Sequence, residues 1–491
     1  MSFKNKNFVL MLAITIVGMM VTLINQSVIN VALPSIMTSL NIKASTAQWL
    51  ATAYLLVGGI LVPVSAYLIQ RFSYRKLFLS SMAFFLAGSL ICAISGSFPV
   101  LLSGRIFQAI GCGILMPLGT NIFLLSFPVE KRGTAMGLLG LGLILAPALG
   151  PTVGGYVLQY YSWNILFYAM SVISIAVILF AAFKFSFEST SQNVKLDFIG
   201  VVLSTIGFAT LLYGVSEISS KGWKNAEVIS FIAISVVTLA AFVLHLLKKE
   251  NPLLELRVFK DFNFSYTAIV NIIMQVALYG GMLMLPIYMQ NVRGYTPLES
   301  GLALLPGSLI LGLMGVFTGK LFDKVGIKPL AFIGLTIMTI VTYMLSKLSL
   351  ETSYTEIVLL YSIRAIGMAF VIMPITSAGL ITLPKELLTH ANALQNTLKQ
   401  VASSIGTAIL IVVMTDQTKS YITELGASAN ADSKVLAAIH GIDAAFLVAT
   451  CIGCVAVIMS FFFRSKKRID AEKNAFIIET MDTDLIDVVE G

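Results

Sequence analysis

Stretches of apolar residues, each long enough to cross a lipid bilayer, recur from one end of this 491-residue sequence to the other. An α-helix needs about 20 apolar residues to span the hydrocarbon core, whereas a barrel strand needs about ten residues of alternating character. The sequence therefore predicts an all-α membrane protein. We identify fourteen spans, near residues 9–33, 48–69, 77–95, 101–124, 134–158, 164–184, 198–216, 227–247, 265–289, 299–321, 329–347, 355–380, 392–415 and 440–463.

Composition agrees with a membrane protein, because 57% of the residues are hydrophobic, 11% are charged and the mean hydropathy is +0.91. A soluble domain carries about 25% charged residues. The four cysteines, Cys92, Cys112, Cys451 and Cys454, all fall in predicted spans. No disulfide framework is therefore expected, and the C-x-x-C pair lacks the second ligand pair that a metal site needs. We expect no metal and no cofactor.

The basic residues predict the orientation in the membrane. Of the 32 Lys and Arg residues, 22 fall on one side of the predicted spans and 7 on the other, while Arg105, Arg364 and Lys399 lie within spans. Cytoplasmic loops carry the excess of Lys and Arg, so both termini are predicted to be cytoplasmic. The net charge of +8 then belongs mostly to the cytoplasmic face, where membrane lipids rather than nucleic acid are its expected partners.

An internal repeat organises the chain. Arg71 and Lys324, in corresponding loops, are 253 residues apart, and Arg105 and Arg364, in corresponding spans, are 259 apart. Nearly equal offsets predict two parallel six-span halves. The predicted units are an N-terminal six-helix bundle (1–190), an inserted two-helix linker (191–250), a C-terminal six-helix bundle (251–465) and a disordered cytoplasmic tail (466–491).

Two corresponding loops carry charged motifs. The later loop contains glycines, an acid and basic residues: Gly319, Asp323, Lys324, Gly326 and Lys328. The earlier loop keeps the bases Arg71, Arg75 and Lys76, but has Gln70 in place of the acid and Ser73 in place of the glycine. A carboxylate and cations at helix ends can bridge neighbouring helices and hold one conformation. The alternative is a positively charged rim with no further role.

Three other motifs lie within spans. Arg105, Gln108 and Cys112 share a helix face in RIFQAIGCG, and an intramembrane guanidinium marks either a functional site or a structural bond to backbone carbonyls. The segment that ends in APALGPTVGG has small residues at every fourth position, Gly142, Ala146, Gly150 and Gly154, and prolines at Pro147 and Pro151, which predicts a close helix contact with a bend. In LINQSVINVALPSI, Gln26 and Asn30 are four residues apart, so this face of the first span should point into the bundle.

These motifs resemble those of the major facilitator superfamily, and in particular its fourteen-span drug:proton antiporters of the EmrB/QacA type, including the LmrB-like subgroup. The resemblance covers roughly residues 8–465. It implies that G-P-x-x-G-G, with Gly150, Pro151, Gly154 and Gly155, is the antiporter motif of the fifth span, and that Arg105 serves proton coupling or the charge balance of the substrate cavity. It also implies a monomer in the cell membrane, with Gram-positive bacteria as the expected source.

One departure from the family pattern concerns the proton carrier. The first-span motif of the family has a carboxylate where this sequence has Asn25, and an amide does not titrate. The nearest acids, Glu217, Asp416 and Asp443, all lie at outer span ends. We therefore expect proton coupling to involve Arg105 and Asn25 together with a rim group, Asp443 or His440, or else the charge of the substrate itself.

A polar and methionine-rich substrate cavity is predicted between the halves. Its candidate residues combine sparse polar anchors with flexible apolar side chains: Gln26, Asn30, Gln108, Met116, Asn271, Gln275, Tyr279, Met368 and Met373. Lys399 matches a basic position that the family often keeps in the thirteenth span, and its role is open.

Two functional hypotheses follow. The first is a multidrug efflux transporter that confers antibiotic resistance by exchanging amphipathic or lipophilic compounds for protons. The second is a translocator of lipids or cell-envelope metabolites on the same fold, which the missing deep carboxylates favour. A membrane enzyme or primary pump is not expected, since the sequence contains no GxxxxGK[ST], H-E-x-x-H or G-x-S-x-G.

Overall fold

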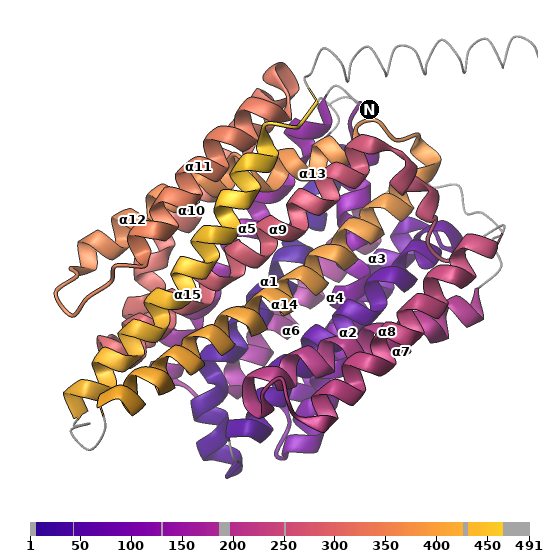
Figure 1. Ribbon diagram of the computed structural model, residues 1–491. Helices are drawn as coiled ribbons and strands as arrows, with labels where there is room; N and C mark the ends of the chain where they lie inside the picture. Colours follow the sequence, from indigo (N-terminus) through magenta and orange to yellow (C-terminus); the bar gives the residue numbers. More distant parts are fainter. Residues whose placement is uncertain are drawn as a thin grey trace, which may run out of the picture.

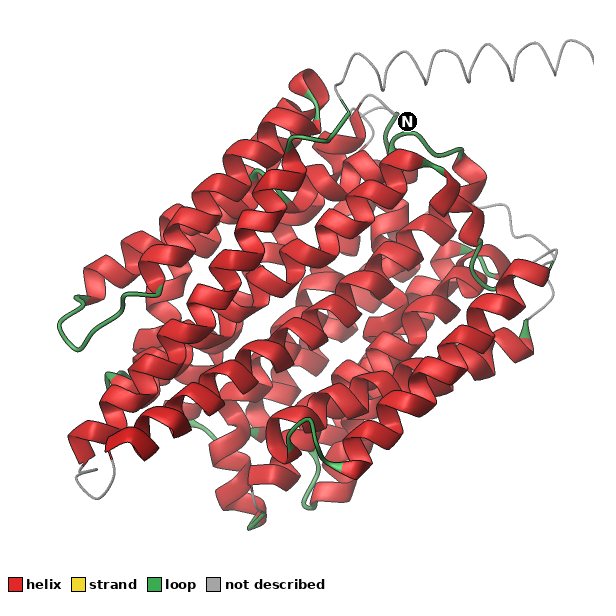
Figure 2. Cartoon of the chain, viewed as in Figure 1, coloured by secondary structure: helices red, strands yellow, loops and turns green. Residues whose placement is uncertain are grey.

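The computed structural model describes residues 6–42, 44–128, 131–185, 197–249, 252–425 and 431–464, and the predicted tail (466–491) lies outside them. Every regular element in this part of the chain is a helix (Figure 2). The first half contains α1 (Lys6–Leu40), α2 (Ala44–Arg71), α3 (Tyr74–Ala93), α4 (Phe98–Ser126), α5 (Arg132–Tyr160) and α6 (Asn164–Lys184). The insert consists of α7 (Phe198–Lys221) and α8 (Ala226–Lys248).

The second half begins with the short 3-10 helix η2 (Leu256–Lys260). It continues with α9 (Phe262–Ile287), the π-helical turn η3 (Tyr288–Val292), α10 (Pro297–Val325), α11 (Ile327–Leu345), α12 (Tyr354–Ala369), α13 (Ile372–Leu380), α14 (Lys385–Leu425) and α15 (Ala431–Ser460). The single span predicted over 355–380 is thus two helices with a break at Phe370 and Val371. Helix α14 continues ten residues past the predicted end of its span, into the predicted outer loop.

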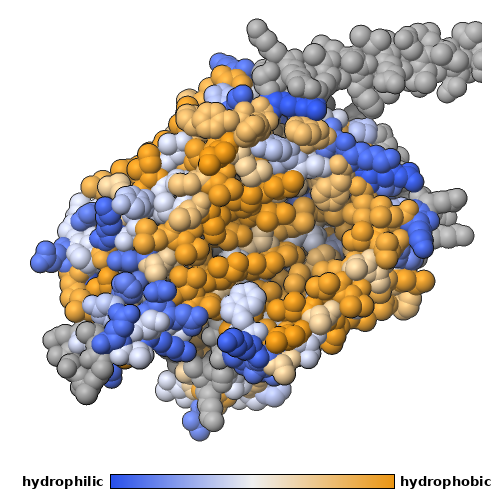
Figure 3. Space-filling model, viewed as in Figure 1, coloured by the Kyte–Doolittle hydropathy of each residue, from blue (hydrophilic) through white to orange (hydrophobic). Residues whose placement is uncertain are grey.

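Twelve helical segments of the described chain are long and apolar enough to cross a membrane. Helices α5 and α9, 29 and 26 residues long, correspond to the two further spans that the sequence predicts. The membrane assignment is supported by the surface, since Figure 3 shows hydrophobic residues across the middle of the visible face and hydrophilic residues towards its two ends. The count of fourteen spans stays a prediction.

Matching helix contacts relate the two halves. In the first half α1 packs on α5 and α6, α3 packs on α4 and α6, and α2 packs on α4. In the second half α9 packs on α14 and α15, α11 packs on α12 and α15, and α10 packs on α12. Each contact has its counterpart when α1–α6 are matched in order to α9, α10, α11, α12–α13, α14 and α15. The repeat read from the sequence offsets is therefore a repeat of structure.

The seams between the halves are unequal. Helix α5 packs along α10 in the most extensive helix contact of the described chain, whereas its counterpart, α2 against α14, is smaller. Helix α7 packs against both α2 and α14 along that smaller seam, where Trp49 stacks on Tyr213 with ring centroids 5.5 Å apart. Figure 1 shows α7 and α8 on the outside of the bundle, on the side away from α11 and α12. The insert thus covers the weaker seam.

A buried carboxylate joins the two ends of the insert. Asp197, whose side chain is 2% exposed, accepts hydrogen bonds from the Gly200 N–H at the start of α7 (3.0 Å) and from Lys249 Nζ (2.8 Å), and lies 2.8 Å from His245 Nε2. Burial alone raises the pKa of this carboxyl, but hydrogen bonds from Lys249, His245 and Gly200 outweigh burial and hold the pKa below its ordinary value. The ionised Asp197 therefore holds the start of α7 and the end of α8 together.

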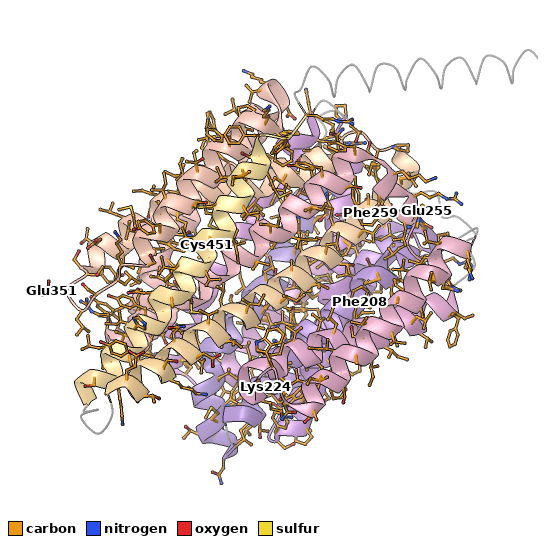
Figure 4. All side chains as sticks on the ribbon, in the orientation of Figure 1. Phe208, Lys224, Glu255, Phe259, Glu351 and Cys451 are labelled. Atoms are coloured by element: carbon orange, nitrogen blue, oxygen red, sulfur yellow. The ribbon has the colours of Figure 1, made fainter. Side chains whose placement is uncertain are left out.

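We call the end of the bundle at which α1 and α9 begin, and where the α2–α3 and α10–α11 loops lie, the basic end. Figure 4 labels Glu255 and Phe259 towards this end, and Lys224 and Glu351 towards the opposite end. The basic end is the one that the sequence predicts to be cytoplasmic.

Candidate transport site and gate

Arg105 lies at the centre of a fully buried polar network in the first half. Its Nε donates to the carbonyl oxygen of Leu50 on α2 (3.1 Å), and one terminal nitrogen donates to Gln108 Oε1 (2.9 Å). Asn25 Nδ2 on α1 donates to the same Gln108 oxygen (3.0 Å), and Gln108 Nε2 donates to Ser89 Oγ on α3 (2.9 Å). The network therefore joins four helices of one half through a single arginine and a single glutamine.

No carboxylate takes part in this network among the described residues. The guanidinium of Arg105 lies over the Tyr54 ring, 4.3 Å from its centroid, and Tyr54 in turn donates to the carbonyl oxygen of Thr22 (3.0 Å). The second terminal nitrogen of Arg105 has no hydrogen-bond partner among the described residues. Carbonyl oxygens, an amide and an aromatic face surround this buried cation.

Arg364 occupies the corresponding place in the second half but makes different contacts. One nitrogen donates to the carbonyl oxygen of Leu278 on α9 (3.2 Å), and Nε donates to Thr342 Oγ1 on α11 (3.3 Å). Its other terminal nitrogen lies 3.9 Å from Met368 Sδ. Arg364 therefore bonds the partner helices directly and without a glutamine intermediary.

The small-residue stripe of α5 faces α1, as its spacing predicts. A Cβ added at Gly150 would lie 1.8 Å from Ser27 Oγ, and one at Gly142 would lie 2.2 Å from Ile16 Cγ2. At Gly154 and Gly155 the nearest neighbours are Val28 of α1 and Leu298 of α10. The stripe lets α5 approach α1 closely; the side chain of Pro151 is outside the described set.

Asp323 closes the basic end by capping a helix of the other half. Its two carboxylate oxygens accept hydrogen bonds from the backbone N–H groups of Gly133 and Thr134, each at 3.1 Å, and from Thr134 Oγ1 at 2.6 Å. These residues form the first turn of α5, where free N–H groups and the helix dipole favour a negative charge. The loop motif is therefore a cap from α10 onto α5.

The earlier loop motif, which has Gln70 in place of the acid, makes the corresponding contact. Gln70 Nε2 at the end of α2 lies 2.6 Å from His390 Nε2 in the first turns of α14. The pair α2–α14 is the structural counterpart of α10–α5, so the amide replaces the carboxylate at an equivalent gate. Arg75, of the same motif, donates to the carbonyl oxygen of Ala182 at the end of α6. Of the other basic residues in the two motifs, Lys324 and Lys328 are exposed and Arg71 is half-buried.

Further hydrogen bonds join the halves towards the basic end. Arg132 donates to the carbonyl oxygen of Leu380 (3.3 Å), and Asn121 Nδ2 donates to Thr389 Oγ1 (2.7 Å). Asn392 Nδ2 donates to the carbonyl oxygen of Pro117 (3.0 Å). A hydrophobic cluster that includes Leu380, Leu388 and Ala391 continues this contact into the first half. The two halves are thus in contact at the basic end in this structure.

The four residues proposed for proton coupling lie in two places. Asn25 and Arg105 share the network described above, whereas Asp443 and His440 lie on α15 towards the other end of the bundle. His440 is exposed and stacks on Tyr421, with ring centroids 4.9 Å apart. One oxygen of Asp443 is buried and has no hydrogen-bond partner among the described residues.

The predicted cavity residues have different immediate surroundings. Gln108 belongs to the arginine network, Met116 packs beside Tyr54, and Met373 packs on α5, where a Cβ added at Gly140 would lie 3.0 Å from its side chain. Gln26 and Gln275 are half-buried, and the side chains of Asn30 and Tyr279 are not described. Asn271 lines a small cavity together with Gln395 and Lys399.

Sequence reasoning missed three contributors to these sites. Thr134 and His390 receive the two gate contacts, and Gln395 adjoins Lys399. Thr134 and His390 lie near helix starts, but their partners belong to the other half of the chain, so only the tertiary structure identifies them. Gln395 is four residues before Lys399 on α14, and this spacing, which puts both on one helix face, is the signal that could have found it.

Two repeated six-helix bundles, with a buried polar core and a gate between them, define a membrane transport protein. Residues 15–407 match the family model of the Major Facilitator Superfamily, and the chain belongs to this family.

Known relatives agree with the assignment. The chain is 45% identical over 420 residues to the uncharacterized MFS-type transporter YhcA of Bacillus subtilis (strain 168), covering 86% of this chain and 79% of that protein. It is 36% identical over 460 residues to the lincomycin resistance protein LmrB of the same organism, covering 93% and 96% of the two chains. A crystal structure of the human organic anion transporter MFSD10 superimposes with a TM-score of 0.61 at 12% identity, covering 92% and 99%, and shows the fold alone.

Proposed function

We propose that the protein is a secondary active exporter that moves amphipathic compounds out of the cell in exchange for protons. The observation that carries the proposal is the pair of equivalent contacts between the halves, Asp323 on α5 and Gln70 on His390. Such contacts stabilise a state closed at one end, and breaking them allows the halves to rock about the polar core. The similarity to LmrB supports a drug-like substrate.

Within this mechanism each element has a separate task. The capping carboxylate of Asp323 favours the state closed at the basic end, because its hydrogen bonds exist only while α10 adjoins the start of α5. The Gly150 stripe keeps α1 and α5 moving as one body. The Arg105–Gln108–Asn25 network holds the first-half helices in register while the path opens and closes.

Export can be measured in a bacterial host that lacks its main drug exporters. Everted membrane vesicles carrying the wild-type protein should accumulate lincomycin or ethidium when a proton gradient is imposed, and should lose them when an uncoupler collapses it. Vesicles with an equal amount of Asp323→Asn protein, in which the gate is weakened, serve as the matched control. Accumulation that is absent for both compounds, or indifferent to the uncoupler, contradicts the proposal.

A second candidate is a translocator of lipids or envelope metabolites. It is favoured by the carboxylate-free surroundings of Arg105 and Arg364 among the described residues, because export of cations usually relies on a buried acid. Proteoliposomes containing fluorescent phospholipids distinguish the two, since lipid translocation without flux of lincomycin or ethidium supports this candidate and opposes drug export.

A further inference from the structure

Lys399 of α14 is a cation in the interior of the second half. It is 14 residues into its helix, so it lies about 21 Å from the basic end at 1.5 Å per residue. Its Nζ donates to Thr376 Oγ1 of α13 at 2.8 Å. An ammonium group has three donors, so two remain beyond this contact.

Two amides with no hydrogen-bond partners adjoin Lys399. Asn271 of α9 and Gln395 of α14 are 3% and 2% exposed, and neither the nitrogen nor the oxygen of either amide is hydrogen-bonded among the described residues. Buried polar groups without partners are rare in folded proteins, because each carries a desolvation penalty of about 1–3 kcal/mol. Four polar atoms in this state beside a half-buried ammonium indicate a ligand site rather than a structural network.

These side chains line one small cavity. Its walls are formed by Ala268, Asn271, Ile272, Gln395, Leu398 and Lys399. In this structure the lining side chains leave no space for a water molecule, so a ligand group enters only when these side chains move apart.

The cavity adjoins the path between the halves. Lys399 is seven residues after Asn392, which places both on one face of α14, and Asn392 bonds to Pro117 of the first half. On α13, Thr376 is one turn from Met373, which packs against α5 at Gly140. A compound located between the halves can therefore extend a polar group into this cavity.

Charge decides what kind of group fits. Among the described residues, neither the buried Arg105 and Arg364 nor the half-buried Lys399 has a carboxylate among its hydrogen-bond or ion-pair partners. A buried charge without a counter-charge is unfavourable, and a ligand that supplies a negative or acceptor group removes that penalty. A cationic group in the same place would add repulsion.

We infer that Asn271, Gln395 and Lys399 form an anion-accepting subsite, which receives a carboxylate or sulfonate of the exported compound. The ammonium donates to the anionic oxygen, and the two amides donate to the remaining oxygens or accept from neighbouring hydroxyls. The inference rests on the proposed export function and adds that amphipathic anions are the compounds, among its substrates, that this subsite binds.

Two xanthene dyes test the charge preference on one ring system. At pH 7.5 fluorescein is an anion and rhodamine 123 is a cation, and binding of each to the purified full chain is followed by fluorescence anisotropy. Wild-type protein should bind fluorescein at least tenfold more tightly than rhodamine 123. Lys399→Met should weaken fluorescein binding about tenfold or more, because it removes a hydrogen bond to a charged group, and should leave rhodamine 123 unchanged or tighter.

Matched variants test whether loss of folding causes the weaker fluorescein binding of Lys399→Met. Lys419→Met removes an exposed lysine from the same helix and should change neither affinity. Lys399→Arg, which keeps the charge, should retain most of the fluorescein binding, and all variants should unfold at temperatures close to that of the wild type. Tighter binding of rhodamine 123 to the wild type, or unchanged fluorescein binding by Lys399→Met, overturns the inference.

The outcomes separate this inference from the export proposal. Vesicles that export lincomycin or ethidium with unaltered dye affinities in Lys399→Met uphold export and refute the subsite. Dye binding that depends on Lys399, in a protein that exports no compound under a proton gradient, upholds the subsite and refutes export.

Discussion

Replacing Asp323 by asparagine tests whether the loop motif holds the basic end closed. The substitution keeps the shape of the side chain but removes the charge that accepts hydrogen bonds from Gly133 and Thr134. Asparagine retains one acceptor oxygen, while its NH₂ group faces backbone N–H donors and repels them. The state closed at the basic end should therefore become less populated.

The size of the change follows from the geometry. Hydrogen bonds to charged groups contribute about 1.5–3 kcal/mol each, and the helix dipole adds about 0.3–1 kcal/mol. Asp323 is only half-buried, so solvent screening lowers this total. We expect Asp323→Asn to reduce the free-energy preference for the closed state by about 2 kcal/mol. That loss corresponds to a shift of about thirtyfold in the ratio of closed to open states.

Spin labels at Lys184 on α6 and Lys328 on α11, both exposed and on opposite halves, report the separation at the basic end. Double electron–electron resonance in proteoliposomes should show a longer-distance population that grows in Asp323→Asn. Glu299→Gln is the control, because Glu299 accepts hydrogen bonds from Thr296 within the start of α10 at the opposite end. Equal distance distributions in Asp323→Asn and wild type refute the capping argument, as does an equal shift in Glu299→Gln.

Three further perturbations probe the core and the insert. Asn25→Asp places a titratable carboxylate against Gln108, one hydrogen bond from Arg105, and should increase substrate-driven proton release, read with a pH dye in vesicles; unchanged release argues against coupling at this position. Gly150→Ala should lower stability by about 1–3 kcal/mol, because its Cβ would lie 1.8 Å from Ser27 Oγ, whereas Gly58→Ala, with nothing within 4 Å, should be nearly neutral in thermal unfolding. Asp197→Asn should lower the unfolding temperature between pH 5 and 8, where the Asp197 carboxyl is ionised. Burial raises the pKa of this carboxyl, but hydrogen bonds from Lys249 and His245 hold it below the ordinary value of about 3.9. The difference from wild type should shrink as the pH falls below that ordinary value, and a constant difference down to pH 2 contradicts the assignment.

Much of the candidate site could be read from local sequence patterns. The four-residue spacing of Gly142, Ala146, Gly150 and Gly154 predicts a close helix contact, and the structure confirms it against α1. The sequence likewise identifies Arg105 as a buried cation and Asp323 as a helix-end carboxylate. Helical periodicity fixes which side chains share a face, so such statements need no tertiary information.

The partners of those residues could not be predicted. Both interpretations offered for Arg105 hold in part, since it bonds a backbone carbonyl and also a network that reaches Asn25. Asp323 caps a helix that begins some 190 residues earlier in the chain. The cavity near Lys399 joins Gln395, four residues earlier on the same helix, to Asn271 of α9, and only the neighbour from α9 needs the tertiary structure.

By itself the sequence determined the helical membrane class, the repeat and the side of the bundle that carries basic charge, because span length, hydrophobicity and loop composition are local properties that the bilayer enforces. Only the tertiary structure decided that α5 seals one seam with α10, that α7 covers the other, and that unpartnered amides meet Lys399. In hydrocarbon, apolar side chains gain little from one helix neighbour over another, so neighbours are selected by shape and by hydrogen bonds between segments distant in sequence.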